Sequence, residues 1–333
     1  MRTLITGASG FVGRHIAEAC LRREWPLHLI ARSASNLEQL EGQPGVTVFR
    51  GELTDAALVR RALNDVDAVI HCAAKVGDWG PVADYRQANV ESLRTLLEAS
   101  KGLGLTRFIH MSSLGVYPPR HHYGSDETTP LPAQHRDGYT QSKVESEQLA
   151  FQYHRDFGIP VVALRPGFVY GPGDRTVMPR IIENLRTGFL RFPGGGQQAM
   201  NTIFIRNLVD AVFLALERDS AVGQAYNLTD GERVSKRQFI EKICDAMNLP
   251  KPTRTPPMWF AWSITWIYEK LYRLIGAKSA PPYNFARLKF MGLNLDFSIE
   301  KARLDLGYRP RVTFDDGMAE TMAWYKTEQL AKV

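Results

Sequence analysis

The chain has 333 residues, of which 44% are hydrophobic, so it can bury a substantial core and general disorder is excluded. Its three cysteines, Cys20, Cys72 and Cys244, are far apart and form no CxxC pair, which argues against a disulfide framework and against a zinc site. The net charge of +6 is localised, because residues 251–311 carry a net charge of +7 and the rest of the chain sums to −1.

The first half of the chain alternates short apolar runs with amphipathic helical patterns, as in the βαβ units of a parallel sheet. The first apolar run begins at Thr3, which leaves no room for a signal peptide and favours a reducing, cytoplasmic location. The expected strands are Thr3–Thr6, Leu27–Ala31, Val46–Arg50, Ala68–Ala73, Arg107–Ser112 and Val161–Arg165. The expected helices between them are Phe11–Arg23, Ala56–Leu63, Tyr85–Lys101 and Tyr139–Asp156.

The next segment, Pro172–Gly196, is an excursion after which we expect the chain to return to the sheet. Two further strands, Thr202–Ile205 and Ala225–Leu228, bracket a helical pattern at Asn207–Arg218. This alternation predicts a doubly wound parallel sheet.

From about Gly231 onward helical patterns dominate, and the last of them is Asp315–Thr327. We therefore predict an α/β fold in which a smaller, mostly helical domain accompanies the sheet. The expected sheet domain comprises residues 1–171 and 200–230, and the expected helical domain comprises residues 172–199 and 231–333.

Three glycines, Gly7, Gly10 and Gly13, follow the first expected strand and open the first expected helix. Glycine lets the backbone turn tightly and approach a pyrophosphate, and a helix N-terminus offers unpaired N–H groups and a favourable dipole. The spacing is GxxGxxG rather than GxGxxG. Alone, the motif fits a plain strand–turn–helix equally well, but together with the features below it predicts a dinucleotide site.

The end of the second expected strand bears on the choice of coenzyme, because it reads Ala31-Arg32-Ser33. An acid there would hold the ribose hydroxyls of NAD and repel a 2′-phosphate, whereas arginine can bind the phosphate through charge-assisted hydrogen bonds. NADP(H) is therefore favoured and NAD(H) stays possible, although Arg32 is also compatible with a plain surface position. Arg14 can assist from the helix, and Glu52, beside Leu53, is either an acceptor for the adenine amino group or a solvated acid.

Tyr139 and Lys143 are four residues apart at the start of an expected helix, so both project from one face. A tyrosine with a pKa of about 10 is a poor base at neutral pH, and we expect the positive charges of Lys143 and an oxidised nicotinamide to lower that pKa. Such a pair is common on surfaces. Its position after the fifth strand is what makes it a candidate catalytic pair here. The partner donor is expected at the carboxyl end of that strand, where Ser112 and Ser113 compete.

The ordered set of motifs resembles the extended short-chain dehydrogenase/reductases of the NAD-dependent epimerase/dehydratase superfamily, over most of the chain. No member of the set is specific alone, whereas the set and its order are. Besides the glycine motif it contains Cys72-Ala73-Ala74, Asn89 within Gln87–Val90, the segment Ser112–Tyr117, the Tyr139 and Lys143 pair, and Arg165–Pro172.

The resemblance implies a Rossmann domain, a C-terminal substrate domain and a Ser–Tyr–Lys site. The family usually places the serine four residues before a tyrosine, which selects Ser113 ahead of Tyr117. Tyr139 would exchange the proton with the substrate. Lys143 would adjust the pKa of Tyr139 and hold the nicotinamide ribose. The implied coenzyme contacts are Gly7, Ser9, Gly10, Phe11, Val12, Gly13, Arg14, Arg32, Glu52, Leu53, Ala73, Ala74, Asn89, Ser112, Tyr139, Lys143, Pro166, Phe168 and Val169.

Within this group, Lys75–Gly80 and the hydrophobic, basic C-terminal region are most similar to the 3β-hydroxysteroid dehydrogenase/isomerase-like branch, which includes bacterial reductases of long-chain β-keto acids. The branch implies a lipophilic substrate, either a 3β-hydroxysteroid or sterol or a long-chain β-keto acid. With the coenzyme that Arg32 favours, we expect an NADP(H)-dependent interconversion of a hydroxyl and a ketone on it. Many of the steroid enzymes carry an acid where this chain has Ala31. The choice of coenzyme and the direction of the reaction are therefore less certain than the fold. By analogy with relatives, a homodimer would pair through Tyr85–Lys101 and Tyr139–Asp156.

Two other functions stay open. A sugar-nucleotide epimerase or dehydratase shares the scaffold and the tyrosine, but it usually holds NAD tightly and needs polar groups for a diphosphate. A protein that senses NADP(H) without chemistry often lacks the tyrosine or the lysine, and both are present here.

The segment Pro256–Tyr268 is uncharged and contains Trp259, Trp262 and Trp266, but it is too short to span a bilayer. It is a lid over an apolar pocket, a buried helix, or an interfacial helix in which nearby Lys270, Arg273 and Lys278 meet anionic lipid, so residues 256–278 are a candidate peripheral membrane contact. His121, His122 and His135 lack the partners of a metal site, and no metal is predicted. Nucleic-acid binding is not expected, because no known motif accompanies the basic charge.

Overall fold

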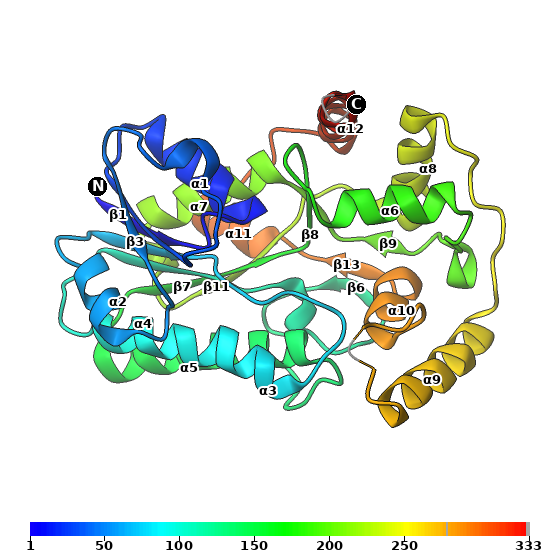
Figure 1. Cartoon of the computed structure of the whole chain (residues 1–333), viewed down its shortest axis with the longest axis horizontal. Coiled ribbons are helices and arrows are strands. Elements are labelled where there is room, and N and C mark those ends of the chain that lie inside the picture. The colour runs from blue at the N-terminus through cyan, green and yellow to red at the C-terminus, as the bar shows by residue number, and fades with distance from the viewer. Residues whose placement is uncertain (278, 331–333) are drawn as a thin grey trace.

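The computed structural model describes residues 1–277 and 279–330, and its centre is a seven-stranded parallel sheet of order β3-β2-β1-β4-β5-β7-β11 (Figure 1). The strand order reverses beside β1, so the carboxyl ends of β1 and β4 open the crevice at which doubly wound folds bind ligands. The predicted α/β Rossmann fold is confirmed. The strands are β1 (Thr3–Thr6), β2 (Leu27–Ala31), β3 (Val46–Arg50), β4 (Ala68–His71), β5 (Arg107–Met111), β7 (Val161–Pro166) and β11 (Ala225–Leu228).

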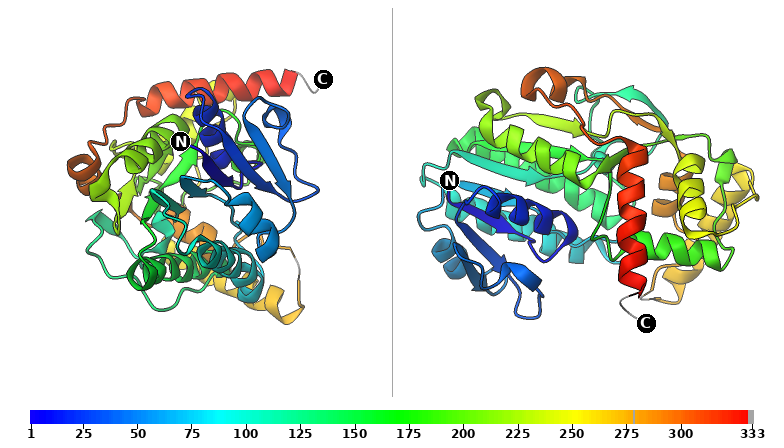
Figure 2. Two further views of the ribbon diagram at one scale, coloured as in Figure 1. Left: turned by 90° about the vertical axis from the view of Figure 1, so that its left-hand side faces the viewer. Right: turned by 90° about the horizontal axis from the view of Figure 1, so that it is seen from above.

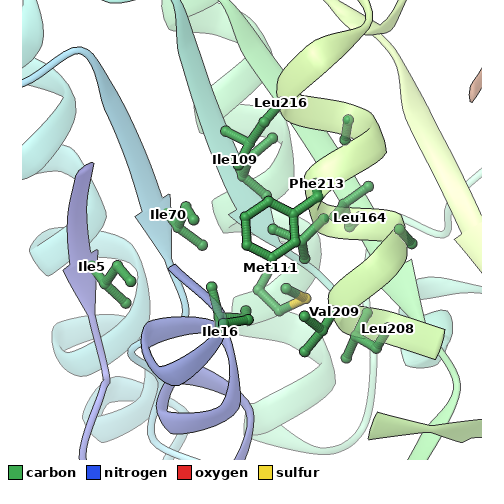
Figure 3. Packing of buried hydrophobic residues seen from close by; sticks show 14 of the residues in the cluster. Ile5, Ile16, Ile70, Ile109, Met111, Leu164, Leu208, Val209, Phe213 and Leu216 are labelled. Carbon is green, nitrogen blue, oxygen red and sulfur yellow. The ribbon is translucent and has the colours of Figure 1, made fainter. Parts of the chain in front are cut away.

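Helices cover both faces of this sheet because its strands are apolar on both sides. On one face Ile70, Ile109 and Leu164 of the strands pack against Ile16 and Phe213 of the helices (Figure 3). That face is covered by α1 (Phe11–Leu21), α7 (Ile205–Glu217) and α11 (Glu300–Leu306), and the other by α2 (Ala56–Ala62), α4 (Ser92–Ser100) and α5 (Gly138–Phe157).

The C-terminal helices and three small strand pairs form a second region beside the carboxyl ends of the strands (Figure 1). The helix α12 (Phe314–Leu330) lies along one surface of the molecule, across the junction between the sheet and the other helices of this region (Figure 2). The helices are α6 (Val177–Arg186), α8 (Lys236–Met247), α9 (Met258–Leu274), α10 (Phe285–Gly292) and α12 (Phe314–Leu330). The strand pairs are β8 (Phe168–Tyr170) with β10 (Thr202–Phe204), β9 (Ala199–Met200) with β12 (Val234–Ser235), and β6 (His122–Ser125) with β13 (Leu295–Phe297).

Three details differ from the sequence expectations. The expected helix Tyr85–Lys101 is interrupted, because a π-helical stretch, η2 (Arg86–Glu91), separates α3 (Val82–Tyr85) from α4. The segment at 202–204 pairs with β8 instead of joining the large sheet. Ile299, Ala302 and Leu306 are buried in the core beneath α7, so part of the expected C-terminal domain packs with the sheet domain. The 3₁₀ helices are η1 (Glu38–Leu40), η3 (Leu114–Val116), η4 (Pro193–Gly195) and η5 (Asp219–Ala221).

Candidate active site

The turn between β1 and α1 has space for glycine only. Gly7 has a φ of +77°, and a Cβ atom there would lie 2.6 Å from the backbone nitrogen of Ala73. A Cβ atom on Gly13 would lie 2.3 Å from the carbonyl oxygen of Gly7. Gly10 precedes α1 with no side-chain cap, so the first N–H groups of the helix are left for another acceptor. This cradle fits the pyrophosphate of a dinucleotide.

The residues around the cradle lie where the sequence places them. Ser9 and Gly10 are exposed, Phe11 and Val12 are half-buried, and the Phe11 ring packs edge-on against His15. Arg14 forms an ion pair of 2.9 Å with Glu18 on the same helix.

Arg32 is exposed at the end of β2 and borders a hollow of about 360 Å³. Ser9, Asn36 and Arg175 line the same hollow. Sequence analysis missed Arg175, because it lies far along the chain and no spacing relates it to Arg32. Glu52 is exposed and Leu53 half-buried beyond β3.

The helix α5 holds Tyr139 and Lys143 over the end of β5. Asp137 caps this helix by accepting a hydrogen bond of 2.7 Å from the backbone N–H of Thr140. Lys143 is buried, and its Nζ donates to the carbonyl oxygen of Met111, the last residue of β5, over 2.7 Å. Tyr139 is half-buried, so its phenol is held by the fold while part of it stays accessible.

The pKa of Tyr139 differs from the sequence expectation. Burial raises that pKa to about 12, the Ser113 hydroxyl opposes the rise and Asp137 adds to it. Burial also lowers the pKa of Lys143 to about 8, and its ammonium is held by the Met111 carbonyl. In the protein without coenzyme the tyrosine pKa is thus raised and not lowered, since desolvation outweighs the hydrogen bond with Ser113. The lowering expected beside an oxidised nicotinamide stays a prediction. A protonated phenol at neutral pH is suited to donate a proton.

The structure distinguishes the two serines. The Ser112 hydroxyl is buried and donates to Glu147 over 2.5 Å, and Glu147 forms a buried ion pair with Arg165. Ser113 is only half-buried, caps η3 through a 3.0 Å hydrogen bond from the Gly115 N–H, and interacts with Tyr139. The structure thus brings Ser113, Tyr139 and Lys143 together and turns the Ser112 side chain away from them.

Asn89 lies in the π-helical stretch and supports the loop after β4. Its Oδ1 accepts a hydrogen bond of 2.6 Å from the Lys75 N–H, and its Nδ2 donates to the Lys75 carbonyl and to the Ser142 hydroxyl. The side chain is thereby engaged, so the geometry gives Asn89 a positioning role, and its predicted contact with coenzyme stays a prediction. Ala73 and Ala74 are half-buried in the loop that Asn89 holds.

The segment after β7 leads from the sheet to the C-terminal region. Pro166 is buried, Phe168 and Val169 are half-buried, and the Phe168 ring packs against Phe290 of α10 at 5.1 Å between centroids. Phe168 also lines a cavity of about 950 Å³ between α6, α8, α9 and α10. Most of the cavity wall is apolar, as in sites for lipophilic ligands.

The tryptophan-rich segment is the helix α9, at the margin of the molecule in Figure 1. Thr265 is its only buried residue, so the interpretation as a buried helix is wrong. Phe260 and Ile264 line the cavity, whereas Trp259 is 70% exposed and Trp266 is 51% exposed. The helix is therefore both a cavity wall and an exposed aromatic surface. Lys278, which sequence analysis added to this surface, lies outside the described residues.

The loop histidines take part in local hydrogen bonds. His121 accepts from the Asn294 N–H, His122 contacts Ser125, and His135 contacts the Val116 carbonyl. In residues 1–277 and 279–330, no helix is long and apolar enough to cross a membrane.

Comparison with known proteins agrees with this geometry. A family model described as "NAD dependent epimerase/dehydratase family" matches residues 3–229. A 2-alkyl-3-oxoalkanoate reductase of Stenotrophomonas maltophilia is 31% identical, over 97% of this chain and 99% of its own. A 3β-hydroxysteroid dehydrogenase/Δ5→4-isomerase of Mycobacterium tuberculosis is 29% identical, over 97% and 90%.

Among solved structures, a dTDP-glucose 4,6-dehydratase from Streptomyces venezuelae with NAD bound is 25% identical. It superimposes with a TM-score of 0.79 over 99% of this chain and 98% of its own. The chain thus belongs to the NAD dependent epimerase/dehydratase family and is an NAD(P)-dependent oxidoreductase.

Proposed function

We propose that this protein uses NADPH to reduce a ketone on a lipophilic substrate, with Ser113, Tyr139 and Lys143 as the catalytic residues. The observation that carries the proposal is the half-buried Tyr139 beside Ser113 at the sheet edge, with its pKa raised to about 12 by burial, together with the apolar cavity that Phe168 lines. Tyr139 is suited to supply a proton, and the cavity is suited to hold an apolar substrate.

The chain's own residues would perform the following steps. NADPH, when bound, would supply the hydride that reduces the carbonyl carbon of the substrate. Ser113 donates a hydrogen bond to the carbonyl oxygen and Tyr139 transfers its phenolic proton to that oxygen, which leaves an alcohol and a phenolate. The Lys143 ammonium stabilises the phenolate until a proton from solvent restores the phenol.

The preference for NADPH is supported by the hollow at the end of β2. Two arginines, Arg32 and Arg175, line it together with the polar side chains of Ser9 and Asn36, and no acid does so in the described chain. A guanidinium group is suited to a 2′-phosphate, because it can donate two parallel hydrogen bonds. Arg175 also forms an ion pair of 3.2 Å with Glu328.

A lipophilic substrate is supported by the cavity and by the relatives. The Stenotrophomonas maltophilia relative is described as a reductase of 2-alkyl-3-oxoalkanoates, and the Mycobacterium tuberculosis relative acts on 3β-hydroxysteroids by its description. A sugar nucleotide would place its polar groups against mainly apolar walls, which makes the epimerase or dehydratase alternative the weaker one.

The test is a coenzyme-oxidation assay with NADPH and NADH. The substrates are a long-chain 3-oxo acid, a 3-ketosteroid and a dTDP-4-keto sugar. We expect NADPH oxidation with the 3-oxo acid or the steroid and none with the sugar nucleotide. Turnover of the sugar nucleotide alone would contradict the proposal.

We also propose that the protein works in the cytoplasm with its α9 helix in peripheral contact with an anionic membrane. Trp259, Trp266 and Leu274 are exposed on the outer face of this helix. The Lys270 ammonium stands over the Trp266 ring at 4.2 Å, so a cation accompanies the aromatic face. Aromatic rings and cations together are suited to the headgroup region of anionic lipid.

A homodimer is a further proposal. The helices α4 and α5 lie side by side at the lower margin of the molecule in Figure 1, where a second copy can meet them. Light scattering in solution tests this proposal, and a monomer at all concentrations would contradict it.

A further inference from the structure

Lys236, the first residue of α8, is a buried cation without an anionic partner. The residue is 1% exposed, and its Nζ donates one hydrogen bond of 3.2 Å, to the carbonyl oxygen of Ala199. No carboxylate of the described residues pairs with it, and its Nζ lies 5.3 Å from the centroid of the Phe290 ring. Burial lowers the pKa of this lysine to about 7.

The position of Lys236 is unfavourable for a structural lysine. The positive end of the helix dipole lies at the start of α8, and it opposes a cation there. An ammonium has three donors, and only one of the three is used by the described residues. A buried charge left in this state destabilises the fold unless a partner satisfies it.

Asn284 is a second buried donor without a partner. Its Oδ1 caps α10 by accepting a hydrogen bond of 2.9 Å from the Arg287 N–H, which fixes the orientation of the amide. Its Nδ2 is buried and has no hydrogen-bond partner among the described residues. Buried polar groups in folded proteins are nearly always satisfied, so an unpaired donor needs an explanation.

Lys236 and Asn284 both line the cavity of about 950 Å³. Asp78 is the only acid in the described lining, and it is already paired with Arg287 over 2.5 Å. The cavity therefore offers hydrogen-bond donors and positive charge on mainly apolar walls.

We propose that this cavity binds the carboxylate of a long-chain acid, with Lys236 as its cationic partner and Asn284 as a further donor. A monoanion would neutralise the single buried ammonium. The lining also contains Arg180, Arg191, Arg254 and Arg287, so a diphosphate is the competing ligand that the titration must separate from a monoanion. The inference rests on the proposed function and makes it more specific, since it selects keto acids over neutral sterols.

Calorimetric titration tests this inference without coenzyme or turnover. The probes are dodecanoate, the neutral analogue dodecanol and uridine 5′-diphosphate. We expect dodecanoate to bind more tightly than dodecanol. Lys236→Met keeps the length of the apolar stem and should weaken dodecanoate binding by about tenfold or more while leaving dodecanol binding unchanged. Asn284→Ser keeps a capping oxygen for α10 and should weaken dodecanoate binding several-fold.

Lys242→Met is the matched control, because Lys242 lies on the same helix but pairs with Asp315 at the surface. This variant should bind dodecanoate as the wild type does, and unchanged dodecanol binding shows that the cavity of each variant is intact. Equal binding of dodecanoate by the wild type and Lys236→Met, or tighter binding of uridine 5′-diphosphate, would overturn the inference. Dodecanoate binding without reduction of any ketone would overturn only the proposed function.

Discussion

The coenzyme half and the substrate region of this molecule differ in how their sites are built. In the first, short sequence segments make the site: a glycine turn after β1 and a lysine one helical turn after a tyrosine on α5. In the second, side chains from distant segments line one cavity, such as Lys236 of α8 and Asn284 at the start of α10. A site made by one short segment can be recognised from the spacing of its residues in the sequence, whereas a site assembled by packing cannot.

The two regions also differ in whether their buried polar groups have hydrogen-bond partners. Beside the coenzyme crevice, Asn89 and Ser112 each find partners inside the protein. In the substrate cavity, Lys236 and Asn284 keep donors without partners, so this region is completed by what it binds. The following experiments test this contrast.

The largest effect is expected from Tyr139→Phe, which removes the proton donor. We predict a fall in kcat of about 100-fold to 10,000-fold, with little change in NADPH affinity. The assay is NADPH oxidation with the preferred ketone. Tyr123→Phe, at a tyrosine that is 73% exposed, is the control and should keep full activity. Full turnover by Tyr139→Phe would show that the phenol is not the proton donor.

The next effect concerns the coenzyme half. Arg32→Ala should raise the KM for NADPH by about tenfold to 100-fold, because a charge-assisted contact with the 2′-phosphate is lost. The KM for NADH should hardly change. Arg60→Ala removes an exposed arginine of α2 and serves as the control. Equal effects on both coenzymes would show that Arg32 does not recognise the phosphate.

In the substrate region, Lys236→Met should stabilise the protein near pH 7. The folded-state pKa of about 7 lies below the ordinary value of 10.5, so the unfolded chain binds more protons between those values. Wild-type stability therefore falls as the pH drops through this range, and we expect a gain of about 1–3 kcal/mol for the variant at pH 7. Urea unfolding at pH 7 and pH 10 measures it. The gain should be smaller at pH 10, and an equal gain at both would exclude the buried charge as its cause.

The smallest effect is expected at the outer face of α9. Replacing Trp259 and Trp266 with serine should reduce sedimentation with anionic vesicles by roughly tenfold, because the aromatic contact is lost. Ketone reduction in detergent-free solution should persist. The control replaces Leu103 and Leu304, two exposed leucines elsewhere in the chain, with serine. Undiminished sedimentation of the tryptophan variant would exclude α9 as the contact.

Sequence patterns predicted the large sheet and the Tyr139 and Lys143 pair, because periodicity and spacing determine both. They did not decide between Ser112 and Ser113 from the residues alone, since that depends on the buried pair of Glu147 and Arg165. They did not show that burial raises the pKa of Tyr139 in the protein without coenzyme, because desolvation comes from packing.

The substrate region was less predictable. Arg175, Lys236 and Asn284 gave no signal, since each is ordinary in its own segment and acquires its role from neighbours in space. The aromatic residues of α9 were visible, but an apolar pattern on both sides of a helix does not show which side faces the cavity. Only the structure separates Phe260 and Ile264 from the exposed Trp266.

The central claim is that Tyr139 is held protonated and gives its proton to the substrate. The pH dependence of kcat/KM for NADPH-driven reduction tests it most directly. We predict a constant value at neutral pH and a decline as the pH rises above about 8, because the Lys143 ammonium that stabilises the phenolate loses its proton there, whereas Tyr139, with a pKa of about 12, keeps its own. A value of kcat/KM for ketone reduction that rises with pH from 7 to 10 would contradict the account.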